Sequence, residues 1–279
     1  MAPRRASGFV LAITLWLLAG ITIAVSLMTL WSMDQVEEAR IGHERVEDEI
    51  ALFGTRDTLL YFASTRELTL AGLPTEVMSD ELRALRRLDE MGRLVRDPIG
   101  GELHLDGSVY RGLRATRFAI QDESGLFSVV LPRDPSLDHF LLGQQVEAQM
   151  VPRLRDTLMD YTDADDLTRL NGAERREYER ERRPPPPNRR LLTPLEIRRV
   201  LGWDALPPAL LADLPERITP FYAGPINLNT MPRSLLPAWI PGCPEACDRL
   251  VQARNEAPFR SGYDLQARVG IQLPGDPAV

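Results

Sequence analysis

The sequence opens with MAPRRASGFVLAITLWLLAGITIAVSLMTLW, residues 1–31, and this stretch decides the fold. No charged residue lies between Arg5 and Asp34, which leaves 28 uncharged residues in a row. As a helix they would extend about 42 Å, more than the ~30 Å hydrocarbon core of a bilayer requires. A cleavable secretory signal would have a shorter apolar core and a small-residue cleavage site at its far end, which this stretch lacks. It therefore predicts a retained single-pass membrane helix.

Charges and spacing extend this prediction in both directions. Arg4 and Arg5 precede the helix, and basic residues favour the cytoplasmic side of a membrane, so the bulk of the chain is expected on the far side. In a Gram-negative cell that side is the periplasm. Apolar residues at 36–52 recur at near-helical spacing with charges between them. The helix is therefore expected to continue outward as an amphipathic half, to about residue 58.

The composition excludes several kinds of function. The chain has 279 residues and a net charge of −7, so its overall charge does not attract polyanions. All 33 basic residues are arginine. Two cysteines and three histidines are too few for a zinc module of the usual spacing. We find no nucleophile–base pair, phosphate-binding loop or metal-binding set of histidines, and we do not expect an enzyme.

A small α/β region is expected after the first helix. Residues 58–73 and 79–94 have helical character, and the pattern then changes to alternation. Segments 117–121 and 126–131 are predicted strands, joined as a hairpin by the Glu-Ser-Gly turn at 123–125. The resulting small antiparallel sheet would pack on the apolar stripe of the amphipathic helix.

Acidic residues gather in DYTDADDLTRLNGAE, residues 160–174. A calcium ion takes six to eight oxygens, mostly from carboxylates and carbonyls, and clustered Asp followed by Gly can supply them. The order of an EF-hand loop is missing. The other interpretation is a solvated helix terminus with acidic capping. The candidate ligands are Asp160, Asp163, Asp165, Asp166 and Glu174.

A proline block separates this segment from the next predicted helix. The mixed-charge run at 174–183 is typical of a solvated helix face. Four prolines at 184–187 then form a stiff, extended spacer. We interpret the spacer as a connector, because a helix start follows with Thr193 as N-cap and Pro194 at the first helical position. A polyproline ligand for a partner's groove is the alternative.

The last third predicts a compact helical unit. Residues 226–271 are expected to form a helix, a tight Pro-Gly turn, a second helix, a cap and a third helix, similar to a helix-hairpin-helix or SAM-like unit. Such units either bind DNA phosphates or pack against protein. Five arginines balance five acidic residues in 226–279, and Pro244 removes a backbone donor from the hairpin. Protein packing is therefore favoured over DNA binding.

Cys243 and Cys247 are the two cysteines of the chain. In an oxidising periplasm with no other cysteine available, a disulfide between them is the leading interpretation. Its loop is short, so the stabilisation would be modest. Two buried thiols are the alternative. Redox catalysis is not expected, because the C-x3-C spacing and the absence of a βαβ pattern do not fit it.

The amino-terminal residues resemble the leader of type IV pilins and pseudopilins. A short basic leader ends in Gly8, followed by Phe9 and unbroken hydrophobic residues. In those families prepilin peptidase cuts after the glycine, and the apolar helix can leave the bilayer to pack in a fibre. Most pilins carry Glu at the fifth mature position, whereas this chain has Ile13. A plain membrane anchor is the other interpretation of the same residues.

Four further segments complete the resemblance. IQDESGLFSV, DYTDADD…NGAE, NRRLLTPLEI and PINLNTMPRSLL appear in the order found in K-class minor pseudopilins of type II secretion, which also lack the fifth-position Glu. The resemblance covers nearly the whole chain. Members of the class usually continue with strands that close the pilin sheet, whereas this sequence ends at Val279.

The resemblance implies a fold and a set of partners. The fold is α+β: a pilin-like long helix with a small antiparallel sheet, plus a large helical domain that contains the SAM-like unit. The expected divisions are 1–8 (leader), 9–58 (assembly helix), 59–135 (pilin-like head), 136–225 (helical domain) and 226–279 (SAM-like unit). The class implies a tip position in the pseudopilus, I-class and J-class partners, prepilin peptidase, an inner-membrane assembly platform and bound calcium. The alternative function is a membrane-anchored periplasmic DNA receptor.

Overall fold

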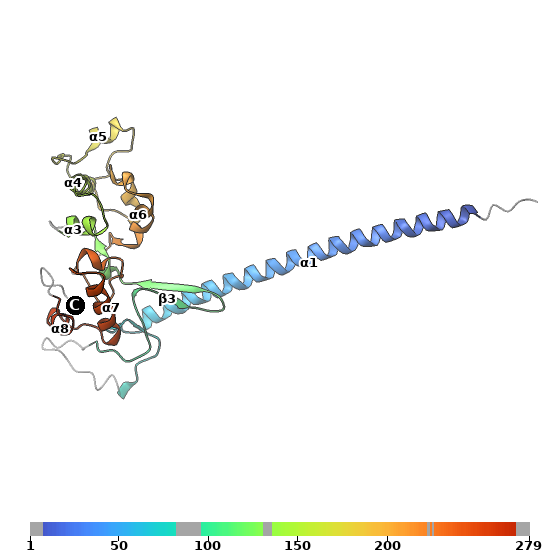
Figure 1. Ribbon diagram of the computed structural model, residues 1–279, viewed down its shortest axis with the longest axis horizontal. Coiled ribbons are helices and arrows are strands. Elements are labelled where there is room, and N and C mark those ends of the chain that lie inside the picture. Colours follow the sequence, from blue (N-terminus) through green and yellow to red (C-terminus); the bar gives the residue numbers. More distant parts are fainter. Residues whose placement is uncertain (1–7, 82–95, 131–135, 222–223, 225, 272–279) are drawn as a thin grey trace, which may run out of the picture. The chain divides into compact units, whose positions relative to one another are not determined.

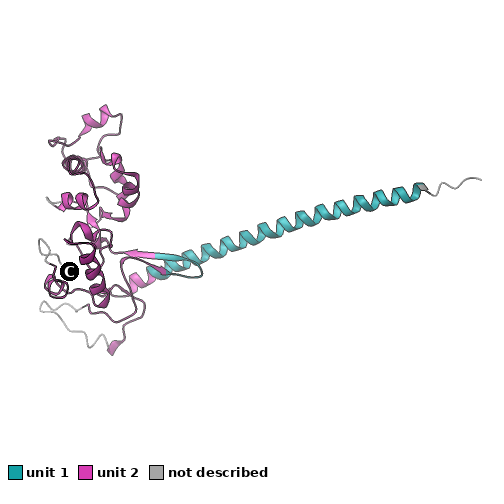
Figure 2. Cartoon of the chain, in the orientation of Figure 1, with its two compact units in different colours: residues 1–60, 111–118 teal, residues 61–110, 119–279 magenta. Residues whose placement is uncertain are grey.

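The computed structural model describes residues 8–81, 96–130, 136–221, 224 and 226–271. The chain divides into two units (Figure 2): residues 1–60 with 111–118, and residues 61–110 with 119–279. The leader with Arg4 and Arg5, most of the helix predicted at 79–94, and the end of the chain from residue 272 lie outside the described residues.

The first unit is built on helix α1 (Gly8–Thr65), which is continuous (Figure 1). Among the described residues it is the one helix long and apolar enough to cross a membrane. Its hydroxyl side chains in the apolar half, including Thr22 and Ser26, donate to carbonyl oxygens three or four residues earlier. Their polar groups are thus satisfied within the helix, as a hydrocarbon environment requires. The predicted long helix is confirmed.

Beyond the apolar half, α1 carries charges and a docked loop. Arg40 forms ion pairs with Glu37 at 2.7 Å and Glu44 at 2.8 Å, and because all three are exposed these pairs add little stability. The loop at 112–116 is fastened more firmly: the Leu113 amide donates to Thr55 Oγ1, itself in a buried residue, at 3.0 Å.

Three small two-stranded sheets follow within the described residues. Strands β1 (Leu73–Pro74) and β2 (Glu102–Leu103) pair antiparallel. Strand β3 (Asp106–Arg111) pairs with β4 (Arg117–Gln121) across the loop at 112–116. Strand β5 (Phe127–Ser128) pairs in parallel with β6 (Ile218–Thr219). The long helix, these sheets and the helices below make an α+β fold, as predicted.

The predicted hairpin around 123–125 is wrong. Strand β4 pairs with β3, which precedes it, and the Glu123–Gly125 segment forms a 3-10 turn leading into β5. Burial explains the difference: Leu126, Phe127, Val129 and Val130 are each at most 5% exposed. A segment buried on both faces pairs inside a core and not as one half of an exposed hairpin.

The helices of the second unit enclose one core. They are α3 (Ser136–Gly143), α4 (Val151–Thr162), α5 (Arg175–Arg180), α6 (Pro208–Asp213), α7 (Glu245–Glu256) and α8 (Gly262–Val269), with short 3-10 segments at Pro194–Arg199, Trp203–Ala205, Leu214–Glu216 and Leu236–Ala238. Helix α3 packs on α4, and α7 on α8. The Phe127 and Phe140 rings stack with centroids 4.3 Å apart.

Local signals placed several helix ends correctly. The segment after the prolines begins at Pro194 with Thr193 in the capping position, although it is a 3-10 helix and Thr193 forms no side-chain cap. Ser261 caps α8 by accepting a hydrogen bond from the Asp264 amide at 3.2 Å. Between residues 226 and 244 the expected first helix of the SAM-like unit is reduced to the 3-10 segment at Leu236–Ala238.

One half-buried carboxylate joins the 123–125 turn to the C-terminal region. Asp122 accepts hydrogen bonds from the Ser124 amide at 3.0 Å, from Asn227 Nδ2 at 3.1 Å and from Thr230 Oγ1 at 2.9 Å. A Cβ on Gly125 would lie 2.4 Å from the Thr230 carbonyl oxygen, so the two backbones approach where only glycine fits. The segments QDESG and INLNT, about a hundred residues apart, are thereby held together.

A buried arginine makes a second long-range connection. Arg254 on α7 is 6% exposed and donates to the carbonyl oxygens of Leu228 and Met231 at 3.0 and 2.6 Å. It also pairs with Asp106, at the start of β3, at 2.9 Å. Burial lowers the pKa of Arg254, and Asp106 opposes that shift. The Arg254 guanidinium therefore stabilises the fold and is not available to bind a ligand.

We expect Asp122→Ala to destabilise the protein by about 2–4 kcal/mol, because it leaves the Asn227 and Thr230 donors without their acceptor. Thermal unfolding of the full chain measures the change. Glu123→Ala is the matched control: this neighbouring side chain is exposed, and its loss should cost less than about 0.5 kcal/mol. Equal stability of the two variants would contradict the role of Asp122.

Candidate functional site

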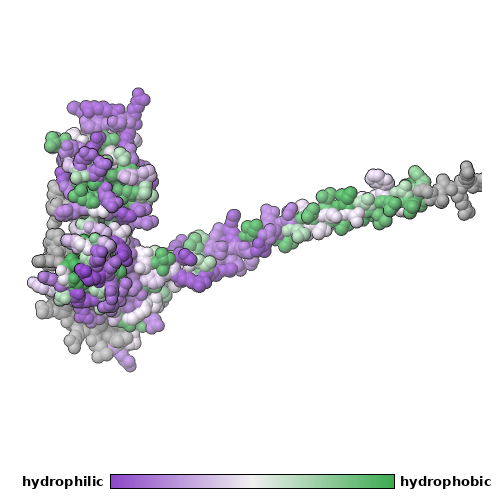
Figure 3. Space-filling view, viewed as in Figure 1, coloured by the Kyte–Doolittle hydropathy of each residue, from purple (hydrophilic) through white to green (hydrophobic). Residues whose placement is uncertain are grey.

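The apolar half of α1 is the largest exposed hydrophobic surface of the first unit. Phe9 is 71% exposed and Ile13 43% exposed, and Figure 3 shows the apolar side chains along this end of the helix. Gly8 is the first residue of α1, so the predicted cleavage junction lies at the helix start. A surface of this size in water is unfavourable, so it requires lipid or neighbouring helices.

The acidic segment leaves the end of α4 and is organised around an arginine. Asp160 is fully buried and accepts hydrogen bonds from the Arg169 amide at 3.1 Å and its guanidinium at 2.5 Å. The same guanidinium contacts Asp163 at 2.5 Å. Gly172 lies against Asp160, where a Cβ would be 1.9 Å from the carboxylate. Arg169, which the sequence did not single out, is thus the internal counter-ion of this segment.

Glu174 is the unsatisfied member of the set. It is 3% exposed, and among the described residues neither of its carboxylate oxygens has a hydrogen-bond partner. Asp163 Oδ1 is likewise buried without a partner. Burial, reinforced by the negative charges of Asp160 and Asp163, raises the pKa of Glu174 to about 7. The segment therefore holds more negative charge than Arg169 neutralises.

Two of the predicted ligands lie apart from this buried centre. Asp165 and Asp166 are exposed; Asp165 Oδ1 accepts from the Leu167 amide at 2.9 Å and Asp166 Oδ1 from Asn188 Nδ2 at 2.9 Å. In the part of the chain that the structure describes, no three His, Cys, Asp or Glu side chains are placed to hold a metal ion. The oxygens that the segment could provide to a cation are the buried carboxylate oxygens of Glu174 and Asp163 that lack hydrogen-bond partners.

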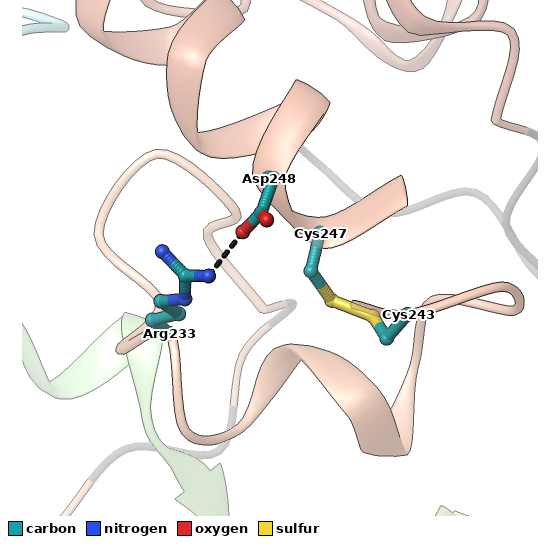
Figure 4. The surroundings of a disulfide bond; sticks show 4 residues. All are labelled: Arg233, Cys243, Cys247 and Asp248. Carbon is teal, nitrogen blue, oxygen red and sulfur yellow. Dashed lines mark hydrogen bonds and ion pairs between the residues drawn. A yellow bond between two sulfur atoms is a disulfide. The ribbon is translucent and has the colours of Figure 1, made fainter. Parts of the chain in front are cut away.

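The two cysteines are joined at the start of α7 (Figure 4). The bond connects the turn after Pro241-Gly242 to the first turn of the helix, where Cys247 is 3% exposed. Asp248, next in the chain, pairs with Arg233. A five-residue covalent loop has little chain entropy to remove, so its stabilisation is small.

The C-terminal arginines are largely occupied. Arg233 pairs with Asp248 and Arg254 with Asp106, while Arg260 pairs with Asp97. Arg268 pairs with an acidic residue one turn earlier and donates to two backbone carbonyls. Within residues 226–271 this leaves Arg249 as the arginine without an ion pair or a contact to a backbone carbonyl. A DNA-binding face needs several cations directed at phosphates, and this region does not present them.

A long apolar helix, small sheets and a helical unit define a pilin-like assembly protein. Two models of the family described as type II secretion system (T2SS), protein K, match residues 132–214 and 226–278. The chain belongs to the type II secretion system protein K family, the K class of minor pseudopilins. It is a structural component of that secretion system, and the apolar half of α1 fits a single-pass membrane anchor.

A solved structure described as the GspK-GspI-GspJ complex from the enterotoxigenic Escherichia coli type 2 secretion system is similar at 18% identity and a TM-score of 0.47, over 81% of this chain and 76% of that chain. No curated protein matches the chain.

The raised pKa of Glu174 predicts a dependence of stability on pH. A carboxyl whose folded-state pKa lies above its unfolded value stabilises the fold below about pH 4.5, and this contribution is lost as the pH rises through about 7. In a chelator, Glu174→Gln should therefore gain stability relative to the unmodified chain between pH 5 and 8, by about 1–3 kcal/mol. Unfolding temperatures of both proteins across this range measure the gain.

Glu179→Gln removes an exposed carboxylate on the same short helix and serves as the control. Its difference from the unmodified chain should stay constant from pH 5 to 8. If Glu174→Gln also shows a constant difference, the carboxyl of Glu174 does not titrate in this range.

Proposed function

We propose that this minor pseudopilin occupies the tip of the type II secretion pseudopilus, where it starts or caps the fibre and supports export of folded proteins. The observation that carries the proposal is the exposed apolar half of α1 with Ile13 at the fifth position after Gly8. In a fibre subunit, a carboxylate at this place would meet the terminal amine of the subunit above. An isoleucine makes no such demand, which suits a subunit with nothing above it.

The proposed mechanism is assembly and involves no bond-making beyond processing of the precursor. Prepilin peptidase cuts after Gly8, and the helix that then begins at Phe9 exchanges lipid for the helices of neighbouring subunits. Arg4 and Arg5 keep the leader in the cytoplasm, so the second unit lies in the periplasm and the anchor in the inner membrane. The proposed partners are the I-class and J-class minor pseudopilins and the inner-membrane assembly platform.

Ile13→Glu tests the tip position. At the tip, the new carboxylate would lie in an apolar environment with no amine above it, at a cost of roughly 3 kcal/mol. We expect loss of co-purification with the two other minor pseudopilins and reduced secretion, measured in the protein's own cell envelope. Ile13→Leu, which keeps the side chain apolar, should behave as the unmodified chain. Normal assembly and secretion with Ile13→Glu would contradict the proposal.

Processing has its own test. Mass spectrometry of the membrane form should show a chain that starts at Phe9 when prepilin peptidase is present, and at Met1 or Ala2 when the peptidase is inactivated. A chain that keeps residues 1–8 in both strains would identify α1 as a plain anchor.

We also propose that the acidic segment binds calcium. The orphaned oxygens of Glu174 and Asp163 support this, because a divalent cation would satisfy both and offset the charge that Arg169 leaves unbalanced. Bound calcium would neutralise the excess negative charge of the segment. The carboxylates of Asp160, Asp165 and Asp166 would add to the electrostatic attraction for the cation.

Calcium should raise the unfolding temperature of the full chain relative to chelator, and Glu174→Gln should abolish most of that rise. Glu179→Gln is the matched control and should keep it. Equimolar magnesium separates a calcium site from general screening of the acidic residues: an equal rise with both ions, or a rise retained by Glu174→Gln, would contradict the site.

A further inference from the structure

A strongly basic surface lies in a chain that is acidic overall. Residues 175–199 contain nine arginines and four acidic residues, whereas the whole chain has a net charge of −7. The segment includes α5 and the proline block and ends with the 3-10 helix Pro194–Arg199. Figure 3 shows hydrophilic side chains over the end of the second unit where α5 lies. Like charges held this close repel one another, so this clustering of arginines is unfavourable unless something binds them.

A cavity opens in the middle of this surface. Its volume is about 370 Å³, and its walls come from α4, the proline block and the 3-10 helix after it. Pro184, Pro185 and Pro187 form one wall with the Tyr161 ring, and Arg183, Arg189 and Arg199 contribute guanidinium groups. The cavity thus combines apolar surface with several cations, the mixture from which ligand sites are built.

The cavity already holds one carboxylate, which shows what its donors accept. Glu196 is 7% exposed and receives hydrogen bonds from Arg189 at 2.9 and 3.2 Å, from the Tyr161 hydroxyl at 3.2 Å and from the Leu192 amide at 2.8 Å. Burial and the nearby Glu196 raise the pKa of Tyr161 to about 12, so its hydroxyl remains a donor. Glu196 is satisfied, and Arg189 is committed to it.

The other arginines at the cavity differ in whether their guanidinium groups already have partners within the protein. Arg183 pairs with Asp204 at 3.1 Å and donates to the Arg198 carbonyl at 3.3 Å. Arg199 in the wall and Arg190, which follows the lining residue Arg189 in the chain, are exposed, and within residues 136–221 neither guanidinium forms a hydrogen bond or ion pair. After the internal pairs among the described residues are formed, Arg199 is left as an unpaired cation in the cavity wall, and Arg190 is a second unpaired cation next in sequence to the lining residue Arg189.

We propose that this cavity and its free arginines form a docking site for an extended acidic segment of a partner protein. A carboxylate of the partner would pair with Arg199 or Arg190 through the planar guanidinium fork. The apolar parts of the segment would lie on the proline wall, which is stiff before binding and so loses little entropy. The cavity lies in the second unit and uses arginines that neither the assembly helix nor the calcium proposal involves, so the proposal extends beyond fibre assembly.

The proline wall favours a carboxylate-bearing peptide over a phosphate group. Four consecutive prolines carry no N–H, so residues 184–187 lack the backbone donors that cradle phosphate in most phosphate sites. Nucleic acid and lipid headgroups would gain from the charge alone. A peptide gains from both the charge and the apolar wall.

The test uses the full chain in a non-ionic detergent and a dye-labelled peptide of alternating Glu and Ala, with binding measured by fluorescence anisotropy at low and moderate salt. Arg190→Gln with Arg199→Gln should weaken binding ~10-fold, the effect expected for loss of a charge-assisted contact. The matched control is Arg175→Gln with Arg176→Gln, which removes the same charge from exposed positions on α5. The control should lose less than about threefold, and unfolding temperatures of both variants verify folding.

Three results would overturn the proposal. One is equal weakening by the two double variants, which would indicate diffuse attraction by the basic surface. Another is absence of peptide binding at low salt. The third is stronger, Arg190- and Arg199-dependent binding to vesicles containing anionic phospholipid, or to duplex DNA, than to the peptide, which would assign the site to phosphate. Tighter binding of the peptide than of either phosphate probe, lost with Arg190 and Arg199, supports it.

Discussion

The apolar half of α1 is the constraint on which the rest of the protein depends. Its backbone hydrogen bonds are closed within the helix, and its hydroxyl side chains return to the helix backbone. What remains is a hydrophobic surface that no other described residue of the first unit covers. Lipid can cover it, and so can other helices of the same kind. The assembly mechanism proposed above would use both states, with the helix first in lipid and then packed against other helices.

Neither environment of the helix tolerates an unpaired charge, and Ile13 meets this condition without help from a partner. A glutamate at this place would need an amine from another subunit to offset the cost of burying a carboxylate in hydrocarbon. The side chain thus removes one requirement for a subunit above. It adds no attraction of its own, so under the proposed tip position the choice of neighbours would depend on other surfaces of the chain.

Those parts of the fold that depend on local rules could be predicted from the sequence. The run without charge between Arg5 and Asp34 defines the apolar helix, and Ser261 marks the start of α8. The pairing of strands could not be predicted in the same way. Alternation at 117–131 fits a hairpin, yet the 126–130 segment is buried on both faces and pairs with residues some ninety positions later. Such a pairing is decided by the core, which a local pattern does not contain.

In the candidate sites too, local sequence features could be predicted and long-range contacts could not. Clustered acidic residues suggested a calcium site with five ligands. Asp160 and Asp163 share Arg169, and burial together with their charges raises the pKa of Glu174, while Asp165 and Asp166 are exposed. The position of Arg169 between Asp160 and Asp163 could not be predicted, because in the sequence an arginine nine residues from a buried Asp looks the same as a solvated arginine. Asp122 and Arg254 were missed for a related reason: their partners are more than a hundred residues away.

The distribution of charge in the second unit follows from how many arginines find partners inside it. In the C-terminal region nearly every arginine forms an ion pair with an acidic residue or donates hydrogen bonds to backbone carbonyls. That region is therefore suited to packing against protein. In residues 175–199 the arginines outnumber the acids, and the buried Glu196 takes only Arg189. The proline block cannot fold back to cover the rest, since it is extended and has no donors. Among the described residues Arg190 and Arg199 have no internal partner, and guanidinium groups pair best with planar carboxylates, which is why the proposed ligand is an acidic segment of another polypeptide.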